Sequence, residues 1–194
     1  KRIELDRIAG VALVFVVGWQ FLLPPSDNLV VFHDSLLPHY RGFSPTVSAL
    51  INGEKEIGVT AFSPREGVDT GPLFKQLSEL ISYPLKIKDA LDIQSNLAAK
   101  IAVELFNKQK FAPLNATEQD ETLATYSIWR DEHDYLIDWS LSSERILRTI
   151  DALGWPYKGA QSYCGGEKVV IHEAERVFPE KVFTNTSPGK IWSI

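Results

Sequence analysis

The stretch Phe32-His33-Asp34-Ser35-Leu36-Leu37-Pro38-His39-Tyr40-Arg41-Gly42 places a histidine on a polar turn, directly after an apolar run. A second stretch, Gly67-Val68-Asp69-Thr70-Gly71-Pro72, follows it and places a carboxylate in a loop bracketed by glycines. A histidine and a carboxylate brought together at strand ends can manage protons at a reacting amine. The two stretches therefore predict a site in which His33 and Asp69 perform acid–base chemistry.

Apolar runs and helix signals alternate on both sides of these stretches. Strands are expected over the runs rich in Val, Ile, Leu and Phe at 11–17, 29–32 and 58–62 and from 73 onward. Ser44-Pro45 and Asn52-Gly53 predict the start and the stop of a helix. A longer helix is expected over 87–108, where apolar residues share one face. Strands that alternate with helices indicate an α/β fold.

The composition changes near residue 115. Residues 111–124 hold Pro, Asn, Thr and several acids, which is typical of a linker. A short helix is expected over 142–153, and strand-like segments follow at 161–163, 168–172 and 190–194. We therefore expect a catalytic domain over residues 1–115, and a linker with a small β-rich C-terminal subdomain over 116–194.

The composition narrows the class of protein further. The net charge of −5 over 194 residues gives no bulk attraction to nucleic acid. The single cysteine excludes an internal disulfide, and the apolar run over 11–23 is too short to cross a bilayer, so a cytoplasmic protein is expected. The four histidines show no metal-ligand spacing, so no metal is expected. The chain lacks methionine altogether, which indicates a partial view of a longer protein.

Taken singly, His33 is more often a hydrogen-bonded structural residue, and Asp69 a turn residue that caps its own backbone. Together, however, the pattern His-x-Ser-Leu-Leu-Pro-x-Tyr-Arg-Gly followed by Asp-Thr-Gly-Pro resembles the active site of the folate-dependent formyltransferases. That family includes methionyl-tRNA, glycinamide ribonucleotide and sugar-nucleotide N-formyltransferases. The resemblance extends over the segments 17–23, 138–140, 146–154, 156–160 and 188–191. It implies a Rossmann-like catalytic domain whose opening part is outside this sequence.

The resemblance also implies a mechanism and a co-substrate, N10-formyltetrahydrofolate, without a metal. An amine would attack the formyl carbon, His33 would donate a hydrogen bond to the oxyanion or shuttle a proton, and Asp69 would orient His33. The residues implied in cofactor binding are Trp19, Gln20, Phe21, Leu22, Gly67, Val68 and Asp69. The residues expected to bind the acceptor are Asp34, Ser35, Tyr40, Arg41, Gly42, Trp129 and Arg130.

One position departs from the family pattern. The family has an asparagine, an oxyanion donor, two residues before the histidine, and this sequence has Val31. Loss of one such donor typically costs about 2.7–4 kcal/mol of transition-state stabilisation. Three readings are open: a neighbour substitutes (Gln20, Asn28 or Ser35), the enzyme is slow, or the protein is a folate- or nucleotide-binding relic.

The acceptor is expected to be the amine of a nucleotide-linked amino sugar, in cell-envelope glycan synthesis. Residues 117–194 carry 13 acidic and 8 basic side chains, a net charge of −5, whereas a tRNA-binding domain should be basic. The aromatic, acidic segment over 127–139 is similar to the one that follows the catalytic domain in sugar-nucleotide N-formyltransferases. Trp129 would stack on a base and Arg130 or Lys158 would meet a diphosphate, unless these aromatics only pack the linker. Methionyl-tRNA is the alternative acceptor, and a homodimer is expected by analogy with the sugar-modifying members.

Overall fold

The computed structural model describes residues 11, 13–19, 21, 23, 25–26, 28–109, 114–178, 183–184 and 187–191. A four-stranded sheet in the order β1-β2-β4-β5 forms the centre of the larger part. Its strands are β1 (Val14–Val16), β2 (Leu29–His33), β4 (Glu56–Phe62) and β5 (Leu73–Leu80). β1 and β2 are parallel, whereas β4 runs antiparallel to both β2 and β5. The α/β class is confirmed, with a mixed sheet that contains one parallel pair.

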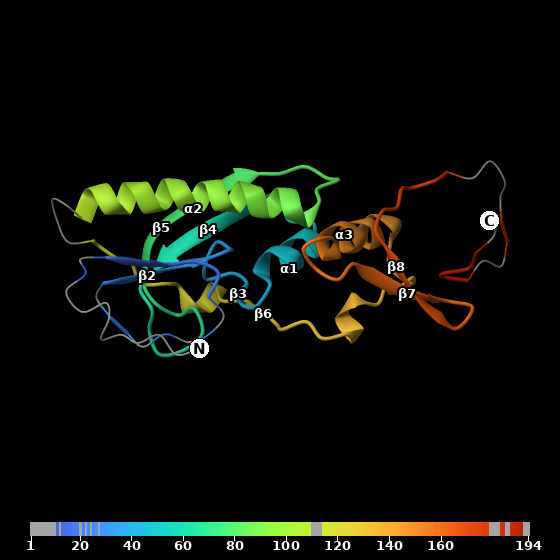
Figure 1. Ribbon diagram of the computed structural model, residues 1–194, viewed down its shortest axis with the longest axis horizontal. Helices are drawn as coiled ribbons and strands as arrows, with labels where there is room; N and C mark the ends of the chain where they lie inside the picture. The colour runs from blue at the N-terminus through green and yellow to red at the C-terminus, as the bar shows by residue number, and fades with distance from the viewer. Residues whose placement is uncertain are drawn as a thin grey trace.

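The helix α2 (Ile87–Gln109) lies along the sheet and covers one of its faces (Figure 1). Its side chains Leu97, Ile101 and Leu105 repeat every four residues, so they share one helix face, and all three are buried. They pack against Val30 and Val59 of the sheet. This hydrophobic layer fixes β2, whose last residue is His33, against the body of the molecule.

The helix α1 (Pro45–Asn52) has the bounds that the sequence predicts. Gly53 ends it in the left-handed conformation (φ 78°), and its N–H donates to the carbonyl of Leu50 at 3.0 Å. Ser44 occupies the N-cap position, but its side chain makes no cap hydrogen bond and its φ is 48°. Ser44 and its unusual backbone line the same pocket as His33, the last residue of β2.

The C-terminal part consists of α3 (Ser143–Leu153) and the antiparallel hairpin of β7 (Ala160–Cys164) and β8 (Glu167–Ile171). In Figure 1, α3 lies beside α1, and the hairpin lies at the far end from the four-stranded sheet. Leu50 of α1, Ile150 and Leu153 of α3 and Ala160 of β7 belong to one buried cluster. The C-terminal part therefore shares a core with α1. Of the third expected strand, Lys190 and Ile191 are described and are not in a strand, and 192–194 lie outside the described residues.

Residues 114–136 connect the two parts. This segment holds the 3-10 turns η2 (Glu121–Leu123) and η3 (His133–Tyr135) and the two-residue strand β6 (Tyr126–Ser127). β6 pairs in parallel with β3 (Arg41–Gly42), which brings the following residues of the connection beside the turn after His33. No helix in the described ranges combines the length and apolar character that a membrane crossing needs.

Candidate active site

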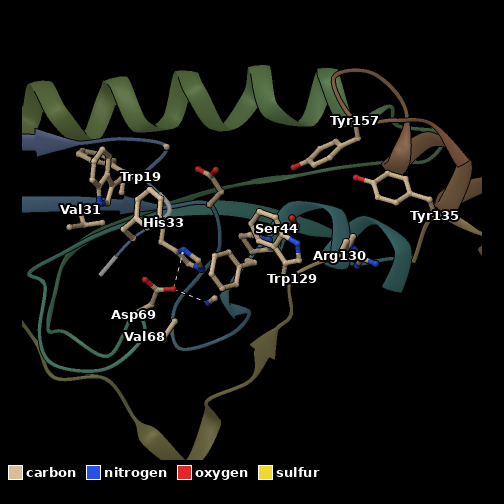
Figure 2. Close-up of a pocket in the computed structure, with 17 residues that line it drawn as sticks. Trp19, Val31, His33, Ser44, Val68, Asp69, Trp129, Arg130, Tyr135 and Tyr157 are labelled. Atoms are coloured by element: carbon tan, nitrogen blue, oxygen red, sulfur yellow. Dashed lines mark hydrogen bonds and ion pairs between the residues drawn. The ribbon is translucent and has the colours of Figure 1, made fainter. Parts of the chain in front are cut away.

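A pocket of about 450 Å³ lies where β2 ends (Figure 2). Because β1 and β2 are parallel, the residues that follow both strands meet at this edge of the sheet. The pocket is lined by Gly18, Trp19, Phe21, Val31, Phe32, His33, Asp34, Gly42, Phe43, Ser44, Pro45, Val68, Asp69, Trp129, Arg130, Tyr135 and Tyr157. The sequence-predicted pair His33 and Asp69 is therefore brought together in one cavity.

His33 is held with one ring nitrogen engaged and the other facing a carboxylate. Its Nε2 lies 2.8 Å from the carbonyl oxygen of Tyr40, and a carbonyl can only accept, so Nε2 carries the hydrogen. Its Nδ1 lies 3.5 Å from Oδ2 of Asp69. In the neutral ring, Nδ1 is then the nitrogen with a free lone pair. His33 can take up a proton at Nδ1, and Asp69 would stabilise the imidazolium that results.

Asp69 is positioned by the backbone of Gly42 and by a side chain that the sequence did not suggest. The N–H of Gly42 donates to Oδ2 of Asp69 at 2.8 Å. The side-chain amide of Gln119 donates to the carbonyl of Asp69 at 2.8 Å and to that of Gly71 at 2.7 Å. Gln119 thus fixes the loop that carries the carboxylate of Asp69. No sequence motif marked it, because its contact with the loop crosses about fifty residues of chain.

Arg41 supports this arrangement from outside the pocket. Its guanidinium is fully buried, donates to Gln119 at 2.7 Å and forms a two-pronged ion pair with Glu121 at 2.7 Å for both bonds. The hydrogen bond with Glu121 raises the pKa of Arg41. The sequence predicts Arg41 as an acceptor-binding residue, whereas the structure places its charge against the 119–121 segment.

Three non-glycine residues in the described ranges adopt a left-handed backbone, and all three lie at this site. They are Tyr40 (φ 58°), Ser44 (φ 48°) and Asp69 (φ 54°). Such conformations are costly for residues with a Cβ and tend to occur at functional sites, where the surrounding structure holds them. Here they orient the carbonyl that binds His33, the start of α1, and the carboxylate itself.

The aromatic side chains form two groups around the cavity. Trp19 and Phe21, after β1, contact edge to face with ring centroids 5.6 Å apart. Phe43 and Trp129 form a second such pair at 5.2 Å. The indole N–H of Trp19 is buried and has no hydrogen-bond partner in the protein. A planar ligand would find apolar walls and an unused donor here.

The predicted cofactor residues are mostly in the pocket. Trp19, Phe21, Val68 and Asp69 line it, and Gly67 does not. Gln20 and Leu22 lie outside the described residues.

The predicted acceptor residues divide into two groups. Asp34, Gly42, Trp129 and Arg130 line the main pocket. Ser35 and Tyr40 line a second cavity of about 350 Å³ instead, which Asp34 also lines. Their hydroxyl groups are engaged, since Ser35 donates to the carbonyl of His39 and Tyr40 to Glu54, each at 2.6 Å. Lys158, proposed for a diphosphate, forms an ion pair with Glu132.

Two additional pocket residues are Tyr135, from the connecting segment, and Tyr157, from the C-terminal part between α3 and β7. Figure 2 shows both directed toward the cavity from the side opposite Asp69. Burial raises the pKa of the Tyr157 hydroxyl, and a hydrogen bond with Ser44 partly offsets this. The only signal for Tyr157 in the sequence was its place in the segment 156–160, which resembles the formyltransferases. The site is therefore built from both parts of the molecule.

Val31 lines the pocket at the position where the formyltransferase pattern has asparagine. Of the three side chains expected to replace that donor, Ser35 and Asn28 are absent from the pocket lining. The amide of Asn28 donates to the carbonyl of Val11 at 3.0 Å, and its oxygen accepts from Ser26 at 2.6 Å. Gln20 lies outside the described residues.

Comparison with known proteins supports the resemblance to the formyltransferases. A family model described as formyl transferase matches residues 2–90, and one described as formyl transferase, C-terminal domain, matches residues 130–194. The chain belongs to the formyltransferase family. Methionyl-tRNA formyltransferase of Dictyoglomus turgidum is 33% identical over 168 residues, which are 84% of this chain and 52% of that protein. The enzyme of the same name from Carboxydothermus hydrogenoformans is 33% identical over 92% of this chain and 58% of its own length. The chain spans about half the length of these curated formyltransferases.

Solved structures share the fold at low sequence identity. A Mycobacterium tuberculosis protein described as a candidate sugar N-formyltransferase matches 92% of this chain and 82% of its own, with a TM-score of 0.74 and 20% identity. The N-formyltransferase of Helicobacter canadensis, solved with folinic acid and dTDP-3-aminofucose, matches 80% of this chain and 60% of its own (TM-score 0.69, 19% identity). Methionyl-tRNA formyltransferase of Clostridium thermocellum matches 79% of this chain and 68% of its own (TM-score 0.65, 22% identity). The Rossmann-like formyltransferase fold is thereby shown.

Proposed function

We propose that this formyltransferase moves the formyl group of N10-formyltetrahydrofolate to the amine of a nucleotide-linked amino sugar. The observation that carries the proposal is the buried His33, with Nδ1 facing Asp69 in a pocket that aromatic side chains also line. We infer, too, that residues 1–115 supply the formyl-transfer groups and that residues 116–194 add acceptor-side residues such as Arg130 and Tyr157.

The chemistry assigned to His33 follows from its two ring nitrogens. The amine nitrogen attacks the formyl carbon and gains positive charge, while the formyl oxygen becomes an oxyanion. Nδ1 of His33 removes a proton from that nitrogen and returns it to N10 as the carbon–N10 bond breaks. Asp69, 3.5 Å away, stabilises the transient imidazolium. Positioned proton transfer of this kind contributes about 10²–10⁴-fold to rate.

The folate side of the pocket is assigned to the segment after β1 and to the Asp69 loop. Trp19, Phe21 and Val68 supply apolar surface for a planar ring. The buried and unpaired indole N–H of Trp19 is a donor that a pterin carbonyl would satisfy. The Helicobacter canadensis structure, which has this fold, was solved with the folate derivative folinic acid.

The acceptor side is assigned to Trp129 and Arg130. Trp129 is 60% exposed although it lines the pocket, so its indole ring is available to stack on a base. Arg130 donates to Ser48 at 2.9 Å, while its Nε is buried and unpaired. That nitrogen can still donate to a phosphate oxygen. The net charge of −5 over residues 117–194 disfavours a polyanion as large as tRNA.

Methionyl-tRNA is the second candidate acceptor, because curated relatives at 33% identity are named as methionyl-tRNA formyltransferases. The two candidates are separated by following tetrahydrofolate release with N10-formyltetrahydrofolate and a panel of acceptors. The panel holds UDP-, dTDP- and GDP-linked amino sugars, with methionyl-tRNA in parallel. We expect turnover with one amino sugar.

An Arg130→Gln variant refines this experiment. With a nucleotide-linked acceptor, we expect the acceptor KM to rise while the KM for the folate is unchanged, because Arg130 would meet only the diphosphate. Turnover with methionyl-tRNA alone would reject the sugar assignment. Turnover with none of the acceptors would reject formyl transfer to an amine and favour a binding protein.

A further inference from the structure

Asp34 is an acidic residue inside the pocket, directly after the catalytic candidate His33. It lines the same cavity as His33, Ser44 and Tyr157. Its charge interacts favourably with His33 and unfavourably with the ionised form of Tyr157, so the carboxylate lies near both side chains. Proton transfer by His33 and stabilisation of its imidazolium by Asp69 do not involve Asp34.

The backbone at Asp34 is anchored, whereas its carboxylate is free. Gln94, 2% exposed, donates from its side-chain amide to the carbonyls of Asp34 and Gly58, at 2.9 Å each. Thr46 in turn donates to the amide oxygen of Gln94 at 2.7 Å. In the described part of the chain, the Asp34 carboxylate takes part in neither a hydrogen bond nor an ion pair. A rigid backbone therefore presents an unsatisfied acceptor group to the cavity.

A carboxylate in such a place needs a cation. Removing a carboxylate from water is costly unless an opposite charge or hydrogen-bond donors compensate. The titratable groups around the cavity are His33, Asp69, Arg130, Tyr135 and Tyr157. Among the described residues no ion pair joins Arg130 to Asp34, and the ring of His33 already has the Asp69 carboxylate 3.5 Å from its Nδ1. The charge of Asp34 is thus left for a ligand.

We propose that Asp34 binds the ammonium form of the acceptor and removes its proton, which converts the acceptor into the nucleophile. This proposal rests on the proposed function. One N–H bond of the ammonium breaks, its proton goes to the carboxylate of Asp34, and the electron pair stays on nitrogen. That nitrogen then attacks the formyl carbon, and His33 passes the second proton from the nitrogen to N10. Tetrahydrofolate and the formamide leave, and Asp34 releases its proton to solvent.

The environment of Asp34 suits this task. Burial raises the pKa of Asp34, and the attraction of His33 offsets only part of that rise. A carboxylate with a raised pKa is a stronger base, and its proton affinity lies closer to that of an amine. Asp34 then takes the first proton of the ammonium and His33 the second, so that His33 does not have to perform both transfers in turn.

The test compares two acceptors in the wild type and in Asp34→Asn. One is the amino sugar nucleotide identified by the panel, and the other is its aminooxy analogue, which is not protonated at neutral pH. With the amine, we expect Asp34→Asn to lower kcat/KM by about 10²–10⁴-fold at pH 7, with a smaller loss as the pH rises and free amine accumulates. With the aminooxy acceptor, we expect little change. Asp92→Asn, on the exposed face of α2, is the matched control.

Each other outcome overturns the proposal. Equal losses with both acceptors would show that Asp34 acts by supporting the pocket. Unchanged turnover of the amine would show that Asp34 has no part in proton removal, although the proposed function would stand. Absence of wild-type turnover with every amine would reject the proposed function itself. Binding of folinic acid, measured by fluorescence, shows whether Asp34→Asn keeps the folate side of the pocket intact.

Discussion

Val31 lines the pocket with a side chain that has no hydrogen-bond donor. The donors nearest in sequence do not replace it, because Asn28 and Ser35 are bonded elsewhere. An oxyanion donor contributes about 10²–10³-fold to kcat. We therefore expect Val31→Asn to raise kcat, measured by tetrahydrofolate release, with Val17→Asn, at the exposed residue directly after β1, as the control. An unchanged or lower kcat would mean that another group already binds the oxyanion.

The burial of Asp34 also predicts how the stability of the fold depends on pH. Its pKa is raised in the folded state by burial, so the folded protein binds a proton more tightly than the unfolded chain does. The free energy of unfolding therefore decreases as the pH rises through and above the ordinary pKa of aspartate. We expect Asp34→Asn to have a higher Tm than the wild type at pH 7, with the difference shrinking toward acidic pH. A lower Tm for the variant at pH 7 would show that the charge of Asp34 stabilises the fold.

The sequence was most informative for residues in compact motifs. His33 and Asp69 could be predicted because each lies in a short pattern of distinctive composition. Gln119 could not, because it acts through two carbonyl groups far away in the chain, and backbone contacts of this kind leave no mark on residue type. The partner of Arg41 could not be predicted either, because an arginine in a motif can bind a ligand or pair with an acid such as Glu121.

Among the secondary-structure elements, the short parallel pair β3–β6 determines the geometry of the site. It is reinforced by the bonds from Arg41 to Gln119 and Glu121, and Gln119 holds the loop of Asp69. We expect Gln119→Ala to lower kcat about 10²-fold, because a shift of about 1 Å in a catalytic group has an effect of that size. Tetrahydrofolate release measures kcat, and folinic acid binding shows whether the folate side of the pocket is intact in the variant.

Glu118→Gln is the control for this prediction, because Glu118 forms only an exposed ion pair with Arg65. Such pairs contribute little, so kcat should be unchanged. If Gln119→Ala keeps full activity, the loop of Asp69 is held by its own backbone and by Gly42 alone.

The helices were predicted better than the strand pairing. α1 and α2 end within a residue of their expected bounds, because Pro, Gly and the apolar periodicity act locally. β3 and β6 are two residues each and join segments more than eighty residues apart, so local sequence carries no signal for them. The antiparallel direction of β4 was not foreseen either, since alternation of strands and helices indicates only an α/β class.

At the scale of the whole molecule, the core that α1 and α3 share joins the two parts of the chain. Leu153 is fully buried in this cluster, with Leu50 and Ile150. We expect Leu153→Ala to lower the free energy of unfolding by about 2–5 kcal/mol, as for other buried leucines. Urea unfolding followed by fluorescence should remain a single transition, because both parts of the chain contribute to the cluster. Two separate transitions would show that the parts fold independently.

The activity that we propose for this pocket is formyl transfer from a folate to an amine, with His33 as the proton carrier. The most direct test incubates the wild type and His33→Ala with N10-formyltetrahydrofolate labelled with ¹³C in the formyl group and with the preferred acceptor. Mass spectrometry of the acceptor then measures the labelled formamide. We predict label on the acceptor with the wild type and a rate lower by about 10²–10⁴-fold with His33→Ala, while folinic acid still binds. Label at equal rates in both proteins would contradict the role proposed for His33, and no label with the wild type would contradict the proposed formyl transfer.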